Sequence, residues 1–138
     1  MNKLKTSCPE VIAEAKRYLD NARDILKTKA GRENGYYKDA KYIRMACATA
    51  YNAVLFAVDE YLERRGKAII KKKHQRKNVD DYKKVLAALN RKLLNHFDGA
   101  YHILHLDGYY DGVCDGKLID LGIQRANEII TGIEHDKF

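Results

Sequence analysis

The residues with the clearest chemical potential are the arginine and the histidine of the hexapeptide RKLLNH, Arg91 and His96. A histidine titrates near neutral pH, so it can act as a general acid or base on a ribose 2′-hydroxyl. An arginine can stabilise the negative charge that develops on phosphorus in the same transition state. The two side chains together could therefore cleave RNA without a metal ion.

The same pair also has a simpler interpretation, as a surface arginine and a histidine at the edge of the core. Five helical positions at about 100° each place the two side chains roughly 140° apart. The two side chains would come together only if the surface of a partner contacted both of them. A chain of this composition is expected to contain about one Arg-x(4-6)-His pair by chance. Arg91 and His96 are thus a candidate catalytic pair, and whether the protein is an enzyme stays open.

A second candidate site is the connector, the run KAIIKKKHQRK at residues 67–77, which has basic residues and no acidic one. Clustered Lys and Arg gain affinity for nucleic acid by releasing counterions from the phosphates. No aromatic residue interrupts this run, so it offers no platform for base stacking. The connector is predicted to be either a solvated loop or a phosphate-binding patch. The candidate nucleic-acid-binding residues are Lys71, Lys72, Lys73, Arg76 and Lys77.

The remaining histidines do not form a metal-binding pattern. His102 and His105 would share one helix face with each other, but no carboxylate or cysteine lies at a matching offset to complete a tetrahedral set with them and His96. The Asp-Gly pairs lack the spacing of a calcium loop. Neither a phosphate-binding glycine loop nor a nucleophile elbow occurs. We therefore expect no metal and no cofactor.

The elements that must position these residues are predicted to be helices in a single domain, residues 1–138. Apolar residues recur every three or four positions. They predict helices from a Ser7–Glu10 capping box to Gly31, from Lys38 to Arg65, from Asn78 to about Phe97, and from about Leu118 onwards. Residues 100–106 would form a short further helix or continue the third one, and residues 107–116 a turn-rich loop.

The expected fold class is all-α, an antiparallel up-and-down bundle of four long helices plus a short helix. The stretch 45–58 is apolar almost all the way round, so the helix from 38 to 65 should be central. No alternating pattern indicates a strand, and the tyrosines at 36, 37, 109 and 110 are expected in loops.

Nothing in the sequence predicts a membrane protein or a secreted one. No stretch approaches the roughly 18 uncharged residues of a membrane span. The N-terminal residues lack the apolar run of a signal peptide. Three widely spaced cysteines suggest reduced thiols rather than a disulfide framework. We expect a cytoplasmic protein without a membrane partner.

Two long stretches resemble HEPN domains, which are small helical bundles. They are YIRMACATAYNAVLFAVDEYLERRG at residues 42–66 and GYYDGVCDGKLIDLGIQRANEIITGIE at residues 108–134. Many HEPN proteins are RNA-cleaving toxins of toxin–antitoxin and defence systems, which act as dimers through an R-x(4-6)-H motif. The resemblance implies a homodimer, RNA and an antitoxin as partners, and Arg91 and His96 as the motif.

Two functions follow from these observations. Our prediction is a non-catalytic HEPN-like module that binds a protein or a nucleic acid. The alternative is a metal-independent ribonuclease that uses Arg91 and His96.

Overall fold

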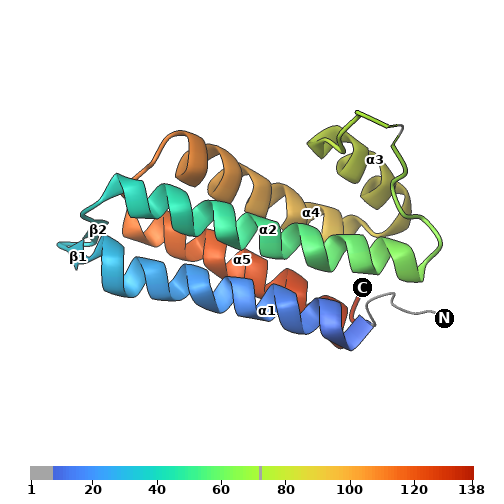
Figure 1. The fold of residues 1–138 in the computed structure, drawn as a ribbon, viewed down its shortest axis with the longest axis horizontal. Coiled ribbons are helices and arrows are strands. Elements are labelled where there is room, and N and C mark those ends of the chain that lie inside the picture. Colours follow the sequence, from blue (N-terminus) through green and yellow to red (C-terminus); the bar gives the residue numbers. More distant parts are fainter. Residues whose placement is uncertain (1–7, 72) are drawn as a thin grey trace.

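The computed structural model describes residues 8–71 and 73–138, and the fold is all-α apart from one short hairpin, as the periodicity predicts. Four long helical segments pack side by side, each antiparallel to the next (Figure 1). They are α1 (Cys8–Asp24) with its π-helical continuation η1 (Ile25–Ala30), α2 (Ala40–Arg64), α4 (Arg91–Ala100) with its π-helical continuation η2 (Tyr101–Tyr110), and α5 (Gly116–Glu134). Within the described residues, every helix is too short or too polar to cross a membrane.

Polar side chains next to the helix starts explain where the helices begin. The Asp39 carboxylate accepts a hydrogen bond from a backbone N–H in the first turn of α2. Asn78 and Asp81 form a reciprocal capping box at the start of α3 (Val79–Leu89). Asp115 accepts two backbone N–H groups of α5, which therefore begins slightly before the predicted Leu118. The predicted box at the start of α1 includes Ser7, which lies outside the described residues.

The helix predicted from Asn78 to Phe97 is two helices, because Asn90 interrupts it. Asn90 has an extended backbone, with φ −159° and ψ 106°. Its N–H donates to the carbonyl of Leu86 and ends α3, while its side chain accepts from the N–H of Leu93 and begins α4. The short helix of the fold is therefore α3, which packs on α4, and residues 100–106 continue α4 into η2.

A two-stranded hairpin, which the sequence pattern did not predict, joins α1 to α2. Strand β1 (Arg32–Glu33) pairs antiparallel with β2 (Tyr36–Tyr37). Two residues per strand are too few to show an alternating pattern. The Tyr37 N–H donates to the carbonyl of Cys114 at 2.9 Å, so the hairpin is held against the start of α5. The expectation that four tyrosines lie in loops is therefore wrong. Tyr36 and Tyr37 lie in β2, and those at 109 and 110 lie in η2.

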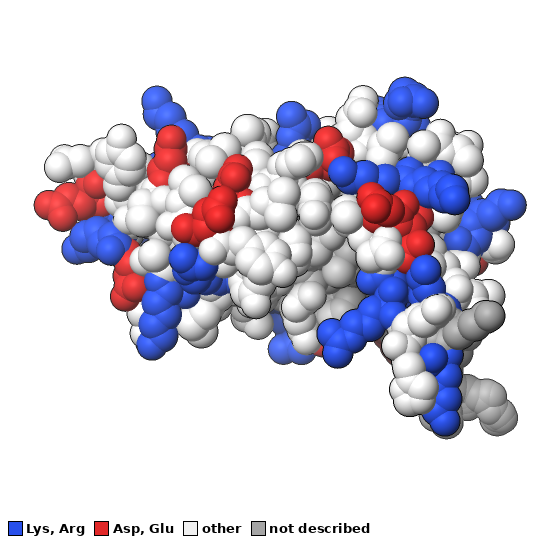
Figure 2. All heavy atoms as spheres, turned by 90° about the horizontal axis from the view of Figure 1, so that it is seen from above, with Lys and Arg blue, Asp and Glu red and all other residues white. Residues whose placement is uncertain are grey.

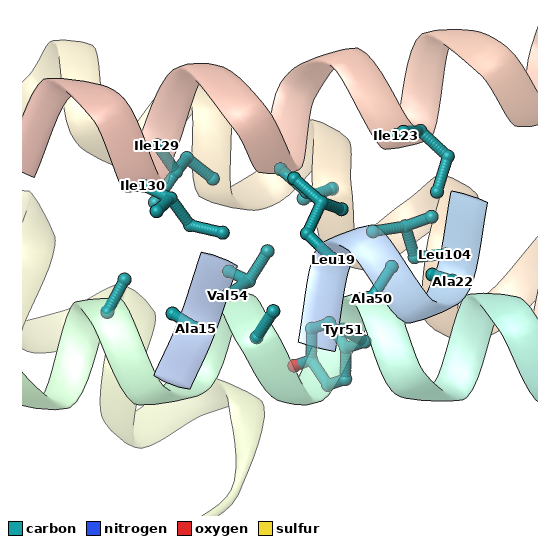
Figure 3. Packing of buried hydrophobic residues seen from close by; sticks show 14 of the residues in the cluster. Ala15, Leu19, Ala22, Ala50, Tyr51, Val54, Leu104, Ile123, Ile129 and Ile130 are labelled. Atoms are coloured by element: carbon teal, nitrogen blue, oxygen red, sulfur yellow. The ribbon is translucent and has the colours of Figure 1, made fainter. Parts of the chain in front are cut away.

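Helix α2 is the centre of the bundle, as its apolar run predicts. It packs against α1, η2 and α5. Its buried face is rich in alanine, including the fully buried Ala46, Ala50, Ala53 and Ala57. Figure 3 shows Ala50 and Val54 of α2 in the same apolar interior as Leu19 of α1 and Ile130 of α5. Small side chains on α2 allow these neighbouring helices to approach closely.

Candidate functional site

Arg91 is the first residue of α4 and points into solvent. Its side chain is exposed. It makes no hydrogen bond, ion pair or ring contact with any residue in the described part of the chain. This position agrees with the interpretation of Arg91 as a surface arginine.

His96 lies on a different face of α4, packed against α5. The Nδ1 atom of His96 is 3.2 Å from Nη1 of Arg125 and 3.7 Å from Oε1 of Glu128. The ring of Phe138 meets the imidazole edge to face, with centroids 6.0 Å apart. A shallow cavity of about 230 Å³ borders His96, and Arg91 is not among the residues that line it. Within one chain, the structure does not bring the candidate catalytic pair together.

The contact with Arg125 determines which atoms of His96 remain available. A guanidinium can only donate, so Nδ1 of His96 must be the acceptor and Nε2 must carry the ring proton. Burial lowers the pKa of His96, and the positive charges of Arg125 and Lys92 lower it further, while Glu128 opposes them. At neutral pH the imidazole is therefore uncharged, and its one lone pair is already occupied. In this arrangement the Nε2–H of His96 can donate a hydrogen bond, but the neutral ring has no free lone pair with which to accept a proton.

In the folded structure, acidic side chains from outside the connector neutralise part of its positive charge. The ammonium of Lys71 pairs with Asp81 at 2.9 Å, and that of Lys77 pairs with Asp59 at 3.2 Å. Lys73 and Arg76 are exposed, and Lys72 lies outside the described residues. Two of the five candidate phosphate contacts are therefore already satisfied by acids of the same chain. The face in Figure 2 likewise carries basic and acidic side chains interspersed near both ends of the molecule.

The histidines of η2 do not assemble a metal site. Nε2 of His102 lies 3.5 Å from Oδ1 of Asp98, one turn away. Residues 8–71 and 73–138 contain no group of three His, Cys, Asp or Glu side chains placed to hold a metal ion.

Rings of η2 form a surface that the sequence analysis did not identify. Tyr101, His105 and Tyr109 follow one another at intervals of four residues, with centroid separations of 5.4 and 5.8 Å and nearly parallel planes. Tyr110 meets His105 edge to face at 5.0 Å. We call these four residues the aromatic face. Tyr109 and Tyr110 expose 41% and 59% of their surface.

The aromatic face carries no charge of its own. Burial lowers the pKa of His105, so its ring is neutral at pH 7. The ammonium of Lys83 lies 5.1 Å from the Tyr101 ring centroid at one end of the face. The guanidinium of Arg44 donates to the carbonyls of Tyr109 and Tyr110 at the other end. The four-residue spacing is visible in the sequence, but the Asp-Gly pair at 107–108 favours a turn there, whereas the structure continues the helix through it.

Comparisons with known proteins extend over nearly the whole bundle. Residues 10–135 match the family described as "Domain of unknown function (DUF5618)". A solved structure, described as a protein of unknown function from Dyadobacter fermentans, is 45% identical in sequence and has a TM-score of 0.82. That match covers 96% of this chain and 100% of the other. The comparison with curated proteins gave no match.

Proposed function

The chain belongs to the DUF5618 family, and we propose that it is a non-catalytic binding module with a HEPN-like fold whose partner is another protein. The aromatic face is the observation that carries this proposal. Aromatic side chains are enriched, and charged ones depleted, at the centres of protein–protein interfaces. Tyr109 and Tyr110 are large aromatic side chains, and they expose 41% and 59% of their surface. In Figure 2 the middle of one face is a white area without basic or acidic side chains, and charged side chains surround it.

The geometry around His96 supports a role without catalysis. The lone pair that a general base needs is occupied by Arg125, and the exposed Arg91 lies outside the cavity beside His96. A second subunit would have to displace Arg125 and bring Arg91 to the histidine at the same time. Binding through the aromatic face requires no such rearrangement.

The HEPN resemblance points to a second copy of the chain as the first partner to test. The same resemblance implies a toxin–antitoxin or defence setting, in which a separate antitoxin chain would be a further partner. A self-complementary aromatic face would bury the exposed rings of both copies around a two-fold axis. This makes the oligomeric state a direct test of the surface.

Light scattering over a concentration series would test the interface with a matched pair of substitutions. Tyr110→Ser removes a ring of the aromatic face, whereas Tyr36→Ser removes an equally exposed ring from β2; the two tyrosines expose 59% and 60% of their surface. We expect the wild type and Tyr36→Ser to form dimers, and Tyr110→Ser to shift towards monomer. A wild-type protein that stays monomeric throughout would eliminate the second copy as the partner.

A metal-independent ribonuclease is the second candidate function, and one feature favours it. The cavity beside His96 is also lined by His135, Lys92 and Lys137. These side chains supply a second imidazole and two ammonium groups that could hold a phosphate. Catalysis by His96 would still require its contact with Arg125 to open, because only then is a lone pair free to take a proton.

A further inference from the structure

A cavity of about 530 Å³ lies between the C-terminal part of α1 and η1 on one side and α5 on the other. It is at the end of the bundle where the β1–β2 hairpin is found (Figure 1), whereas the connector and α3 are at the opposite end. Neither Arg91, nor His96, nor any residue of the aromatic face lines it. Its volume is typical of sites for small molecules, which span roughly 300–1,000 Å³.

One wall of this cavity holds a guanidinium that is fixed in place. Nη1 of Arg32 donates to Oδ2 of Asp120 at 2.6 Å, and the guanidinium carbon lies 5.0 Å from the ring centroid of Tyr37. The Tyr37 hydroxyl donates to the other oxygen of Asp120 at 2.7 Å. The guanidinium also packs so closely on Gly116 that a Cβ at that position would overlap it. These contacts order Arg32 before any ligand arrives, which reduces the entropic cost of binding.

Both sides of the cavity also supply polar groups that have no partner among the described residues, Lys27 from η1 and two amides from α5. Lys27 is exposed and forms no hydrogen bond or ion pair with the residues that the structure describes. The side-chain amides of Gln124 and Asn127 likewise make no hydrogen bond inside the described ranges. Such groups would donate to a ligand without first breaking an internal contact.

Charge and polarity together define the class of ligand. Three cationic side chains line the cavity. Arg23 and Arg32 each form an ion pair with an acidic side chain, whereas Lys27 forms none with the described residues. Burial, with the hydrogen bond to Asp120, raises the pKa of Tyr37 to about 12, so the phenol adds no negative charge. The buried side chains of Leu26 and Ile123 provide an apolar part of the lining. The site therefore combines excess positive charge with an apolar surface.

We propose that this cavity binds a small organic anion, with its carboxylate or phosphate between Lys27 and Arg32 and its apolar part against Leu26 and Ile123. Arg32 offers a planar group with several donors, and Lys27 adds a mobile ammonium, which is a suitable pair for an anionic oxygen cluster. The proposal is independent of the aromatic face and of any activity at His96.

Titration of the full chain with three probes would test this site: phenyl phosphate, benzoate and inorganic phosphate. Binding would be followed by amide chemical shifts and calorimetry. We expect shifts around η1, the hairpin and the first turns of α5, and tighter binding of an aromatic anion than of inorganic phosphate. The ranking of phenyl phosphate and benzoate then identifies the preferred anionic group.

Two neighbouring lysines of η1 provide the matched comparison. Both are exposed, but Lys27 lines the cavity and Lys29 does not. Because Lys27 contributes a charge-assisted hydrogen bond, Lys27→Gln should weaken binding of the better probe about tenfold, and Lys29→Gln should not change it. Failure of both aromatic probes to shift the named segments at millimolar concentration would overturn the proposal. Equal weakening by the two substitutions would overturn it as well, since it would indicate a general attraction to a basic protein.

Discussion

Nη1 of Arg125 lies 3.2 Å from Nδ1 of His96, so the arginine that contacts this histidine comes from α5 and not from α4. The contact occupies the histidine's lone pair, and the nearby positive charge adds to burial in lowering its pKa. Arg91, only five positions before His96, is left in solvent. The pair that suggested chemistry in the sequence thus lies on two different faces of α4, and only the face of His96 packs on α5.

The first prediction concerns RNA cleavage. With single-stranded RNA and a chelator present, we expect the purified wild type to show no cleavage above background, because His96 has no lone pair available as a base. General acid–base catalysis contributes about a hundredfold to ten-thousandfold, so an active site would be plain in a gel assay. Chelator-resistant cleavage that disappears in both His96→Ala and Arg91→Ala would establish the ribonuclease instead. Loss of cleavage in His96→Ala and Arg125→Ala alone would assign the arginine of α5 to the reaction.

A second prediction links stability to pH through His96 and His105, whose pKa values burial lowers in the folded state. Below about pH 6.5 the histidines bind protons more readily in the unfolded chain than in the folded chain. The free energy of unfolding should therefore fall as the pH drops from 7 towards 5. The slope cannot exceed about 1.4 kcal/mol per pH unit for one histidine.

Urea denaturation at a series of pH values would measure this slope. His96→Gln should flatten it, and Asn95→Gln, at an exposed position of the same helix, should not. A slope that His96→Gln leaves unchanged would mean that this histidine protonates as readily in the folded protein as in the unfolded one.

The third prediction tests the position of α2 in the core. Ala50 has no exposed surface and lies among the apolar side chains of neighbouring helices. Ala50→Asp would bury a charge without a partner, at a cost of several kcal/mol, comparable with the whole stability of a small domain of about 5–15 kcal/mol. We expect circular dichroism to show an unfolded chain. Asn52→Asp, at an exposed position of the same helix, is the control and should remain folded.

The fourth prediction concerns the connector. Lys73 and Arg76 are exposed, whereas Lys71 pairs with Asp81. If the connector meets phosphates, replacing Lys73 and Arg76 together by Gln should weaken RNA binding and reduce the salt slope by about one for each phosphate that is no longer neutralised. Lys71→Gln should instead lower the stability slightly, as for other solvent-accessible ion pairs. Unchanged affinity and slope in the double variant would identify the connector as a solvated loop.

Several features of the fold could be predicted from the sequence because they depend on residues close together in the chain. Asn78 begins α3 by bonding a backbone N–H three residues on, and the apolar run of residues 45–58 makes α2 the central helix. The break at Asn90 is equally local, since one amide caps the start of α4. The sequence pattern does not reveal it, because the apolar residues keep their three-and-four spacing on both sides of the break.

What the sequence by itself determined is therefore the helical class, most helix starts and the centre of the bundle, since hydrogen bonds within one turn and apolar periodicity decide these. Only the tertiary structure decided which side chains share a site. Arg32 and Asp120 are 88 positions apart yet 2.6 Å from each other, and His96 meets an arginine 29 positions away instead of the one beside it in RKLLNH. Such pairs depend on how the β1–β2 hairpin, α4 and α5 pack against one another, and that packing is set by the shape of the whole core rather than by the spacing of any two residues.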